Sequence, residues 1–187
     1  MTVSLEDDRY WTYEDYLQLP DDRNRYEIIH GRLYVSPPPR TFHQTVSRRI
    51  QFLLYRLEQE KKGFIFNAPV GLMIPGGTPV EPDLVYLRTE QRQFIEERYI
   101  NGPPHLVVEI LSPSTASRDR TLKLNLYAQA RVPHYWIVDP DACTLEVYHL
   151  KGDHYLVHAA LDKDGSYTAT EEAEGLEIHL PEIFAEY

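Results

Sequence analysis

Cysteine is almost missing from this chain of 187 residues, whose one thiol is Cys143. A single cysteine excludes a disulfide within the chain and a zinc site built from several thiolates. Cys143 follows a strong turn signal at residues 139–141, and the sequence around it predicts neither a helix N-terminus nor a partner side chain. These features favour an inert thiol over a reactive one.

Long apolar runs are also absent. No stretch approaches the roughly 20 residues that a membrane-spanning helix requires. The first residues lack the order of positive charge followed by apolar residues that marks a signal peptide. We therefore expect a cytoplasmic protein without a membrane partner.

An excess of positive charge is missing as well. The formal net charge is −10, from 29 acidic and 19 basic residues. This balance argues against non-specific coating of nucleic acid, which needs a broadly basic surface. The net charge does not argue against a local basic cleft.

The length and composition fit one globular domain over residues 1–187, since 42% of the residues are hydrophobic and 26% are charged. No internal repeat, low-complexity segment or linker divides the chain. The predicted elements follow the order strands, helix, strands, helix, strands, which indicates a mixed α/β (α+β) fold.

Hydrophobic periodicity and turn residues predict the positions of these elements. An N-terminal hairpin is expected over residues 25–36, with His30 and Gly31 in a tight turn. The other expected elements are helices over about 43–62 and 117–130, strands over 64–74, 80–88, 135–139 and 144–149, and a C-terminal hairpin of 155–160 with 166–169.

The first predicted helix opens with a polar turn. Thr41 and Gln44 have the spacing of a capping box, and an apolar stripe follows them. His43 lies in this first turn, where a structural role is more common than a catalytic one.

One carboxylate stands inside an apolar strand pattern. The run 104–113 is mainly apolar, with β-branched residues and leucines between two prolines, and Glu109 stands in its middle. An unpaired buried charge costs several kcal/mol or is neutralised by a shifted pKa. Such a residue is therefore usually paired with a cation, bound to a metal or catalytic.

A second acid, Asp83, stands at the head of the apolar run 84–87. An acid in this position can simply be a turn residue, without a chemical role. However, one loop separates its strand from that of Glu109, so the strands can be neighbours with facing carboxylates, which repel without a cation or proton between them. Oxygen ligands without Cys or clustered His favour Mg²⁺ or Mn²⁺. Phosphodiester hydrolysis is the reaction class that suits such an ion.

Two further residues are candidates for this cluster. Lys123 lies on the helix after the Glu109 strand, where it would orient an attacking water. It also stands four residues after Asp119, the spacing of an ordinary exposed ion pair. Glu27 is an acid in a strand pattern, and an edge-strand charge that faces water is an equally good interpretation.

Several segments of the chain occur together in a specific order. They are residues 26–31, 82–85, 106–115, 119–123, 127 and 135–140. This combination resembles the Uma-two family of restriction endonucleases, within the PD-(D/E)XK nuclease superfamily. The resemblance extends over about residues 12–180.

This resemblance implies a restriction-endonuclease-like core, in which helices flank a central mixed β-sheet and the two terminal hairpins are additions. It implies that Asp83 and Glu109 bind the metal, that the backbone carbonyl of Ile110 assists, and that Glu27 is an auxiliary acid. Leu111 occupies the position of the lysine in the superfamily pattern. The resemblance implies that Lys123, on the following helix, takes that role.

We therefore expect a metal-dependent endonuclease that hydrolyses DNA. By analogy with the family, a homodimer is the expected assembly, since two cuts across a duplex need two sites. The alternatives are a non-catalytic member that binds nucleic acid or protein, and a hydrolase of another phosphate ester. A glycosidase also uses two carboxylates, but a magnesium-type site with a lysine fits this set better. His154 and His158 share a strand face without a third ligand and are expected to be surface histidines.

Overall fold

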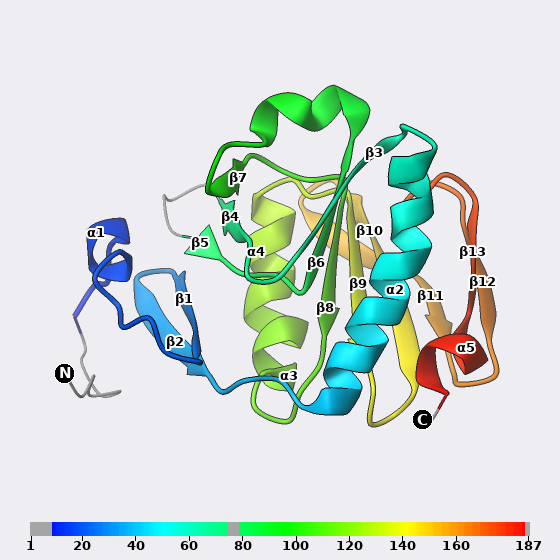
Figure 1. Ribbon diagram of the computed structural model, residues 1–187, viewed down its shortest axis with the longest axis horizontal. Helices are drawn as coiled ribbons and strands as arrows, with labels where there is room; N and C mark the ends of the chain where they lie inside the picture. The colour runs from blue at the N-terminus through cyan, green and yellow to red at the C-terminus, as the bar shows by residue number, and fades with distance from the viewer. Residues whose placement is uncertain (1–8, 75–78, 186–187) are drawn as a thin grey trace.

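The computed structural model describes residues 9–74 and 79–185, which form a layered structure around a six-stranded sheet (Figure 1). The strand order is β11-β10-β9-β8-β6-β3. In chain order these strands are β3 (Gly63–Asn67), β6 (Leu84–Arg88), β8 (Leu106–Ile110), β9 (His134–Asp139), β10 (Thr144–Lys151) and β11 (His154–Leu161).

The sheet is mixed because β8 and β9 pair in parallel, whereas the other neighbours are antiparallel. A parallel pair needs a crossover, and a helical segment provides it here. This segment consists of α3 (Ala116–Arg118), the π-helical turn η2 (Asp119–Lys123) and α4 (Leu124–Gln129).

Strand β8 lies at the centre of the sheet, and all of its residues are buried. Its side chains alternate between the two faces, as in any strand. Leu106, Val108 and Ile110 belong to the core on one face, whereas Val107 belongs to the core on the other. Glu109 therefore shares the face of Val107, which is the face that α4 covers.

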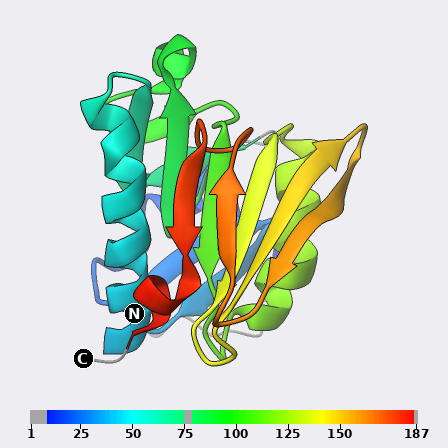
Figure 2. The ribbon, with the colours of Figure 1, turned by 90° about the vertical axis from the view of Figure 1, so that its right-hand side faces the viewer.

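The opposite face is covered by α2 (Thr41–Gln59), α5 (Leu180–Phe184) and a hairpin of β12 (Ser166–Ala169) with β13 (Leu176–His179), as Figure 2 shows. The apolar stripe of α2 packs on this face through Val46, Ile50, Leu54 and Leu57. The helical spacing of these residues in the sequence predicted this stripe, and their burial confirms it.

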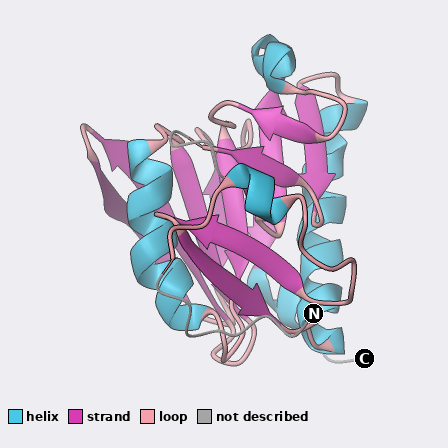
Figure 3. Cartoon of the chain, turned by 90° about the vertical axis from the view of Figure 1, so that its left-hand side faces the viewer, coloured by secondary structure: helices cyan, strands magenta, loops and turns pink. Residues whose placement is uncertain are grey.

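The predicted N-terminal hairpin is confirmed as β1 (Arg25–Ile29) and β2 (Arg32–Ser36). His30 and Gly31 both have positive φ, 51° and 75°, as a tight turn of this type requires. The hairpin is not part of the central sheet, and Figure 3 shows it in front of that sheet.

The remaining elements are short. A three-stranded sheet has the order β5-β4-β7, and the helix α1 precedes the hairpin. Their bounds are α1 (Tyr13–Tyr16), β4 (Gly71–Met73), β5 (Pro79–Val80), the 3₁₀-helix η1 (Thr89–Phe94) and β7 (Tyr99–Asn101).

Three predictions about local structure are wrong. Residues 155–160 and 166–169 do not pair, because β11 joins β10 and β12 joins β13, so the C-terminal hairpin lies further along the chain. The run 64–74 forms two strands in different sheets, because Pro69 between them cannot donate to a ladder. Thr41 is the first residue of α2 rather than its cap, and Arg40 at the cap position makes no side-chain capping bond.

None of the helices in the described residues is both long enough and apolar enough to cross a membrane.

The packing of α2 gives a test of the core. Leu54 is 1% exposed, so Leu54→Ala should lower the free energy of unfolding by about 2–5 kcal/mol, through lost burial and a cavity. Phe52 on the same helix is 71% exposed, and Phe52→Ala should change it by no more than about 0.5 kcal/mol. Urea denaturation of both variants measures the difference, and equal effects would contradict this account of α2.

Candidate active site

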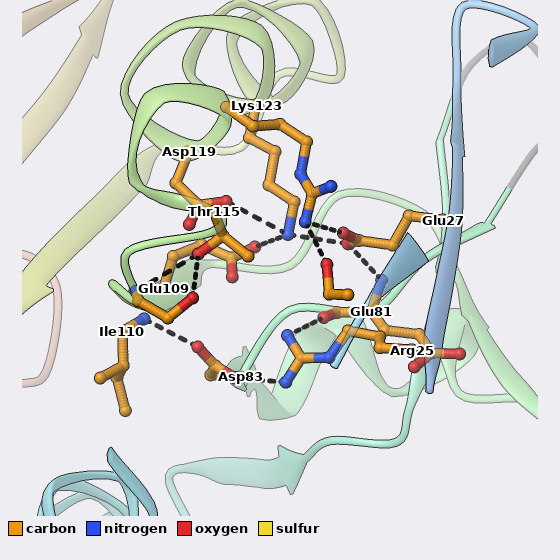
Figure 4. A network of polar contacts seen from close by, with 12 residues as sticks. Arg25, Glu27, Glu81, Asp83, Glu109, Ile110, Thr115, Asp119 and Lys123 are labelled. Atoms are coloured by element: carbon orange, nitrogen blue, oxygen red, sulfur yellow. Dashed lines mark hydrogen bonds and ion pairs between the residues drawn. The ribbon is translucent and has the colours of Figure 1, made fainter. Parts of the chain in front are cut away.

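Asp83 and Glu109 meet because their strands are neighbours. Strands β6 and β8 pair antiparallel with Leu84 opposite Val108, so one step further places Asp83 opposite Glu109. Both side chains are buried and lie in the network of Figure 4. The prediction that these two strands are adjacent in the sheet is therefore confirmed.

Asp83 is surrounded by hydrogen-bond donors. Arg25 Nη2 lies 2.8 Å from Oδ1, and the backbone N–H of Ile110 donates to Oδ2 at 2.8 Å. His43 Nε2 is 3.3 Å from Oδ2. Burial by itself would raise the pKa of Asp83, but the hydrogen bond from His43 and the charge of Arg25 outweigh it and lower that pKa. These donors therefore favour the ionised form of Asp83.

Glu109 has the opposite environment. Its Oε1 accepts hydrogen bonds from Lys123 Nζ at 2.8 Å and from the Tyr127 hydroxyl at 2.6 Å. Burial, together with the charges of Asp119, Asp83 and Glu27, raises the pKa of Glu109 to about 8 despite the nearby Lys123. Negative charge on Glu109 is thus poorly compensated by the protein alone, and an added cation would stabilise it.

Lys123 is the centre of the network in Figure 4. Its ammonium lies 2.7 Å from Glu27 Oε1, 2.8 Å from Glu109 Oε1 and 3.6 Å from Asp119 Oδ1. Burial would lower the pKa of Lys123, but these three carboxylates outweigh burial and raise it. The alternative of an exposed pair with Asp119 is wrong, because Lys123 is only 1% exposed.

Glu27 enters this network from the separate N-terminal hairpin. It accepts a hydrogen bond from the backbone N–H of Glu81 at 3.1 Å, and its Oε2 lies 3.1 Å from Arg118 Nη2. Burial would raise the pKa of Glu27, but Lys123 and Arg118 lower it below its ordinary value. The alternative of an edge-strand charge facing water is wrong, since Glu27 is fully buried.

A pocket of about 250 Å³ opens onto these groups. It is lined by Asp83, Glu109, Ile110, Asp119 and Lys123. Residues 36–40, which lead from the hairpin into α2, and residues 112–115, which follow β8, also line it. The pocket therefore gives a ligand access to the carboxylates.

The donor set suits a hard divalent cation. Asp83 Oδ2 and the Ile110 carbonyl oxygen both approach His43 Nε2, at 3.3 Å and 2.9 Å, so the two oxygens converge on one group. Glu109 adds a carboxylate whose charge is under-compensated. Oxygen ligands of this kind are those that Mg²⁺ and Mn²⁺ prefer.

The sequence did not indicate several residues of this site. His43 contacts Ile110 and Asp83, although a structural role was expected for it. The sequence feature that could have identified it is its position on the apolar face of α2, three residues before Val46. Arg25, Arg118 and Tyr127 are further residues of the network, but nothing in their local spacing connected them to Glu109.

Comparison with known proteins agrees with this fold. Residues 13–181 match the model of the Uma2 (Uma-two) family, described as "Putative restriction endonuclease". An uncharacterised protein of Synechocystis is 28% identical over 142 residues, which is 75% of this chain and 74% of that protein. A crystal structure from Anabaena variabilis, described as a putative nuclease belonging to DUF820, has a TM-score of 0.77 at 20% identity and covers 93% of this chain and 97% of its own. The mixed sheet flanked by helices is thus shared with that structure.

Removing the central ammonium should destabilise the protein. Lys123→Met keeps much of the side-chain volume but leaves Glu27, Glu109 and Asp119 without their shared cation. We expect a loss of about 3–5 kcal/mol in the free energy of unfolding at neutral pH, measured by urea denaturation.

The matched control is Lys163→Met, at an exposed position, which should change this energy by no more than about 0.5 kcal/mol. Adding Glu27→Gln to Lys123→Met should recover part of the loss, because it neutralises a buried carboxylate that would keep only Arg118 as an ion-pair partner among the described residues. A loss for Lys123→Met no larger than that of the control would refute this account of the network.

Proposed function

The chain belongs to the Uma2 family, and from this membership we propose that it is a metal-dependent endonuclease that hydrolyses DNA phosphodiester bonds. The observation that carries the proposal is the facing pair Asp83 and Glu109 in the lining of a pocket, with the buried Lys123 bonded to Glu109. This is a set of groups suited to binding a cation and activating a water beside a phosphate.

Three groups would hold the metal: the carboxylates of Asp83 and Glu109 and the backbone carbonyl of Ile110. Mg²⁺ or Mn²⁺ is proposed, because all three offer oxygen. When bound, such an ion would polarise a phosphoryl oxygen and lower the pKa of a bound water. The raised pKa of Glu109 supports its role, since a cation would replace the proton that the buried carboxylate otherwise favours.

The protein's own groups orient the reaction. An ammonium has three N–H donors, and Lys123 uses two of them on Glu27 and Glu109. Its contact with Asp119, at 3.6 Å, is longer than a hydrogen bond, so the third donor is available to a water in the pocket. We propose that Lys123 orients the attacking water, while Glu27 holds Lys123 in place as the auxiliary acid.

Arg25 and His43 have a different task in this proposal. Both contact Asp83 and keep it ionised, as a metal ligand must be. His43 also contacts the Ile110 carbonyl, so it aligns the two proposed ligands with each other. Arg40 and Arg25 line the same pocket and add positive charge where a phosphate would enter. The proposed place of action is the cytoplasm, where DNA is accessible to such an enzyme.

Cleavage assays test this function. Plasmid and single-stranded DNA should be cut in the presence of Mg²⁺ or Mn²⁺ and left intact with a chelator. Glu109→Gln should lower the cleavage rate at least about 100-fold, the scale expected when a preorganised electrostatic group is lost. The exposed Glu90→Gln is the matched control and should keep the wild-type rate.

The assay also separates the alternatives. If wild type and Glu109→Gln are equally inactive on every substrate, the endonuclease proposal fails. Salt-dependent DNA binding without cleavage would instead favour a non-catalytic binding module. Hydrolysis of small phosphate esters but not of DNA would favour a different phosphoesterase.

A homodimer is the proposed assembly, because cutting both strands of a duplex requires two such pockets. Light scattering of the purified protein should give about twice the chain mass of 21.9 kDa. A mass equal to one chain, unchanged on adding duplex DNA, would refute this assembly and leave single-strand cleavage as the activity.

A further inference from the structure

The end of the central sheet remote from Glu109 holds a second cluster of ionisable side chains. His134 is the first residue of β9, and its partner in the antiparallel ladder is His149 of β10. On the other side His134 pairs with Leu106, three residues before Glu109 along β8. Successive side chains in a strand point to opposite faces, so Leu106 and Glu109, three residues apart, lie on opposite faces. The two histidines share the face of Leu106 and therefore lie opposite Glu109.

A carboxylate reaches these histidines from the hairpin that covers this face. Glu172 lies between β12 and β13 and is fully buried. Its Oε1 forms a hydrogen bond with His149 Nε2 and accepts another from the Tyr167 hydroxyl at 2.6 Å. His134 and His149 are also buried, at 6% and 4% exposure, and their rings are in contact with centroids 4.6 Å apart.

Two buried atoms of this cluster have no hydrogen-bond partner within the described part of the chain. They are Glu172 Oε2 and His134 Nδ1. Buried polar atoms are nearly always satisfied, by protein, water or an ion, so each unsatisfied atom indicates something that the protein side chains do not supply. A simple ion pair of His149 with Glu172 leaves both atoms unexplained.

We propose that His134, His149 and Glu172 form a binding site for a divalent transition-metal ion, with Zn²⁺ as its representative. Each residue offers one ligand atom, and these atoms lie within 4.8 Å of one another. Two imidazoles and a carboxylate suit Zn²⁺, whereas Mg²⁺ prefers oxygen ligands alone. A water can complete a tetrahedral set of ligands around Zn²⁺.

The site is a structural clamp. It would fasten the turn between β12 and β13 to the central strands β9 and β10. Neighbouring contacts already hold the same turn, since Arg88 pairs with Glu174 at 2.8 Å and the ring of His105 contacts the Glu171 carbonyl at 2.8 Å. The clamp is separate from the proposed nuclease site, because His134 and His149 lie on the sheet face opposite Glu109 and the pocket is lined by none of the three clamp residues.

Zinc titration of the chelator-treated full chain tests the proposal. Because the pocket can also bind Zn²⁺, the titration is done on Glu109→Gln as well as on wild type. Glu109→Gln should still bind about one Zn²⁺ per chain in isothermal calorimetry, with a higher melting temperature when Zn²⁺ is bound. In this background, His149→Gln and Glu172→Gln should each weaken Zn²⁺ binding by at least about 10-fold.

His154→Gln is the matched control, since His154 lies on the adjacent strand β11 and is exposed, as predicted from the sequence. Its Zn²⁺ affinity should equal that of the Glu109→Gln parent. Nitrogen-15 NMR of the histidine rings avoids any folding defect of the variants. Zn²⁺ should shift the ring signals of His134 and His149 and leave those of His154 unchanged. Absence of Zn²⁺ binding by Glu109→Gln, or unshifted His134 and His149 signals, would overturn the proposal.

Discussion

The structure depends on the buried ammonium of Lys123, which pairs with carboxylates from separate parts of the chain. Lys123 joins Glu27 of the N-terminal hairpin, Glu109 of the central strand and Asp119 of its own helical segment. Any of these acids would be costly to bury alone, and the lysine would be costly without them. The network therefore explains why a hairpin outside the central sheet is held against the core. It also explains how a strand as apolar as β8 tolerates a carboxylate.

Two facing carboxylates acquire different properties in this setting. Asp83 is surrounded by Arg25, His43 and a backbone N–H, and its pKa is lowered despite burial, whereas burial and neighbouring acids raise the pKa of Glu109 to about 8. Active sites commonly separate the pKa values of paired groups in this way. The arrangement also fits an acidic chain, with a net charge of −10, because Arg25 and Arg40 place positive charge at the pocket without a general basic surface.

The sequence predicted those parts of the fold that depend on local patterns. The apolar strand around Glu109, its pairing with the Asp83 strand, the apolar stripe of α2 and the tight turn at His30 and Gly31 all follow from such patterns. Local patterns do not determine which distant segments pair. The sequence therefore predicted a hairpin of β11 with β12, whereas β12 pairs with β13. For the same reason His43 was not connected with Ile110, which lies 67 residues later in the chain. Spacing predicted the pairing of Lys123 with Asp119 and the family resemblance implied its role beside Glu109, while its burial became visible only in three dimensions.

The π-helical turn η2 lies in the crossover between β8 and β9 and contains two residues of the network around Lys123. Its wider turn contains Asp119 and Lys123, both buried, and the stripe of α4 continues from it with Leu126 and Tyr127. Such a turn holds one residue more than an α-helix of the same height. An α-helical turn at this place would therefore be one residue shorter between the same two flanks. Asp119 and Lys123, at the two ends of the wider turn, both belong to the network around Glu109. Single π-helical turns occur frequently at functional sites, and this one lies in the segment that carries the central lysine.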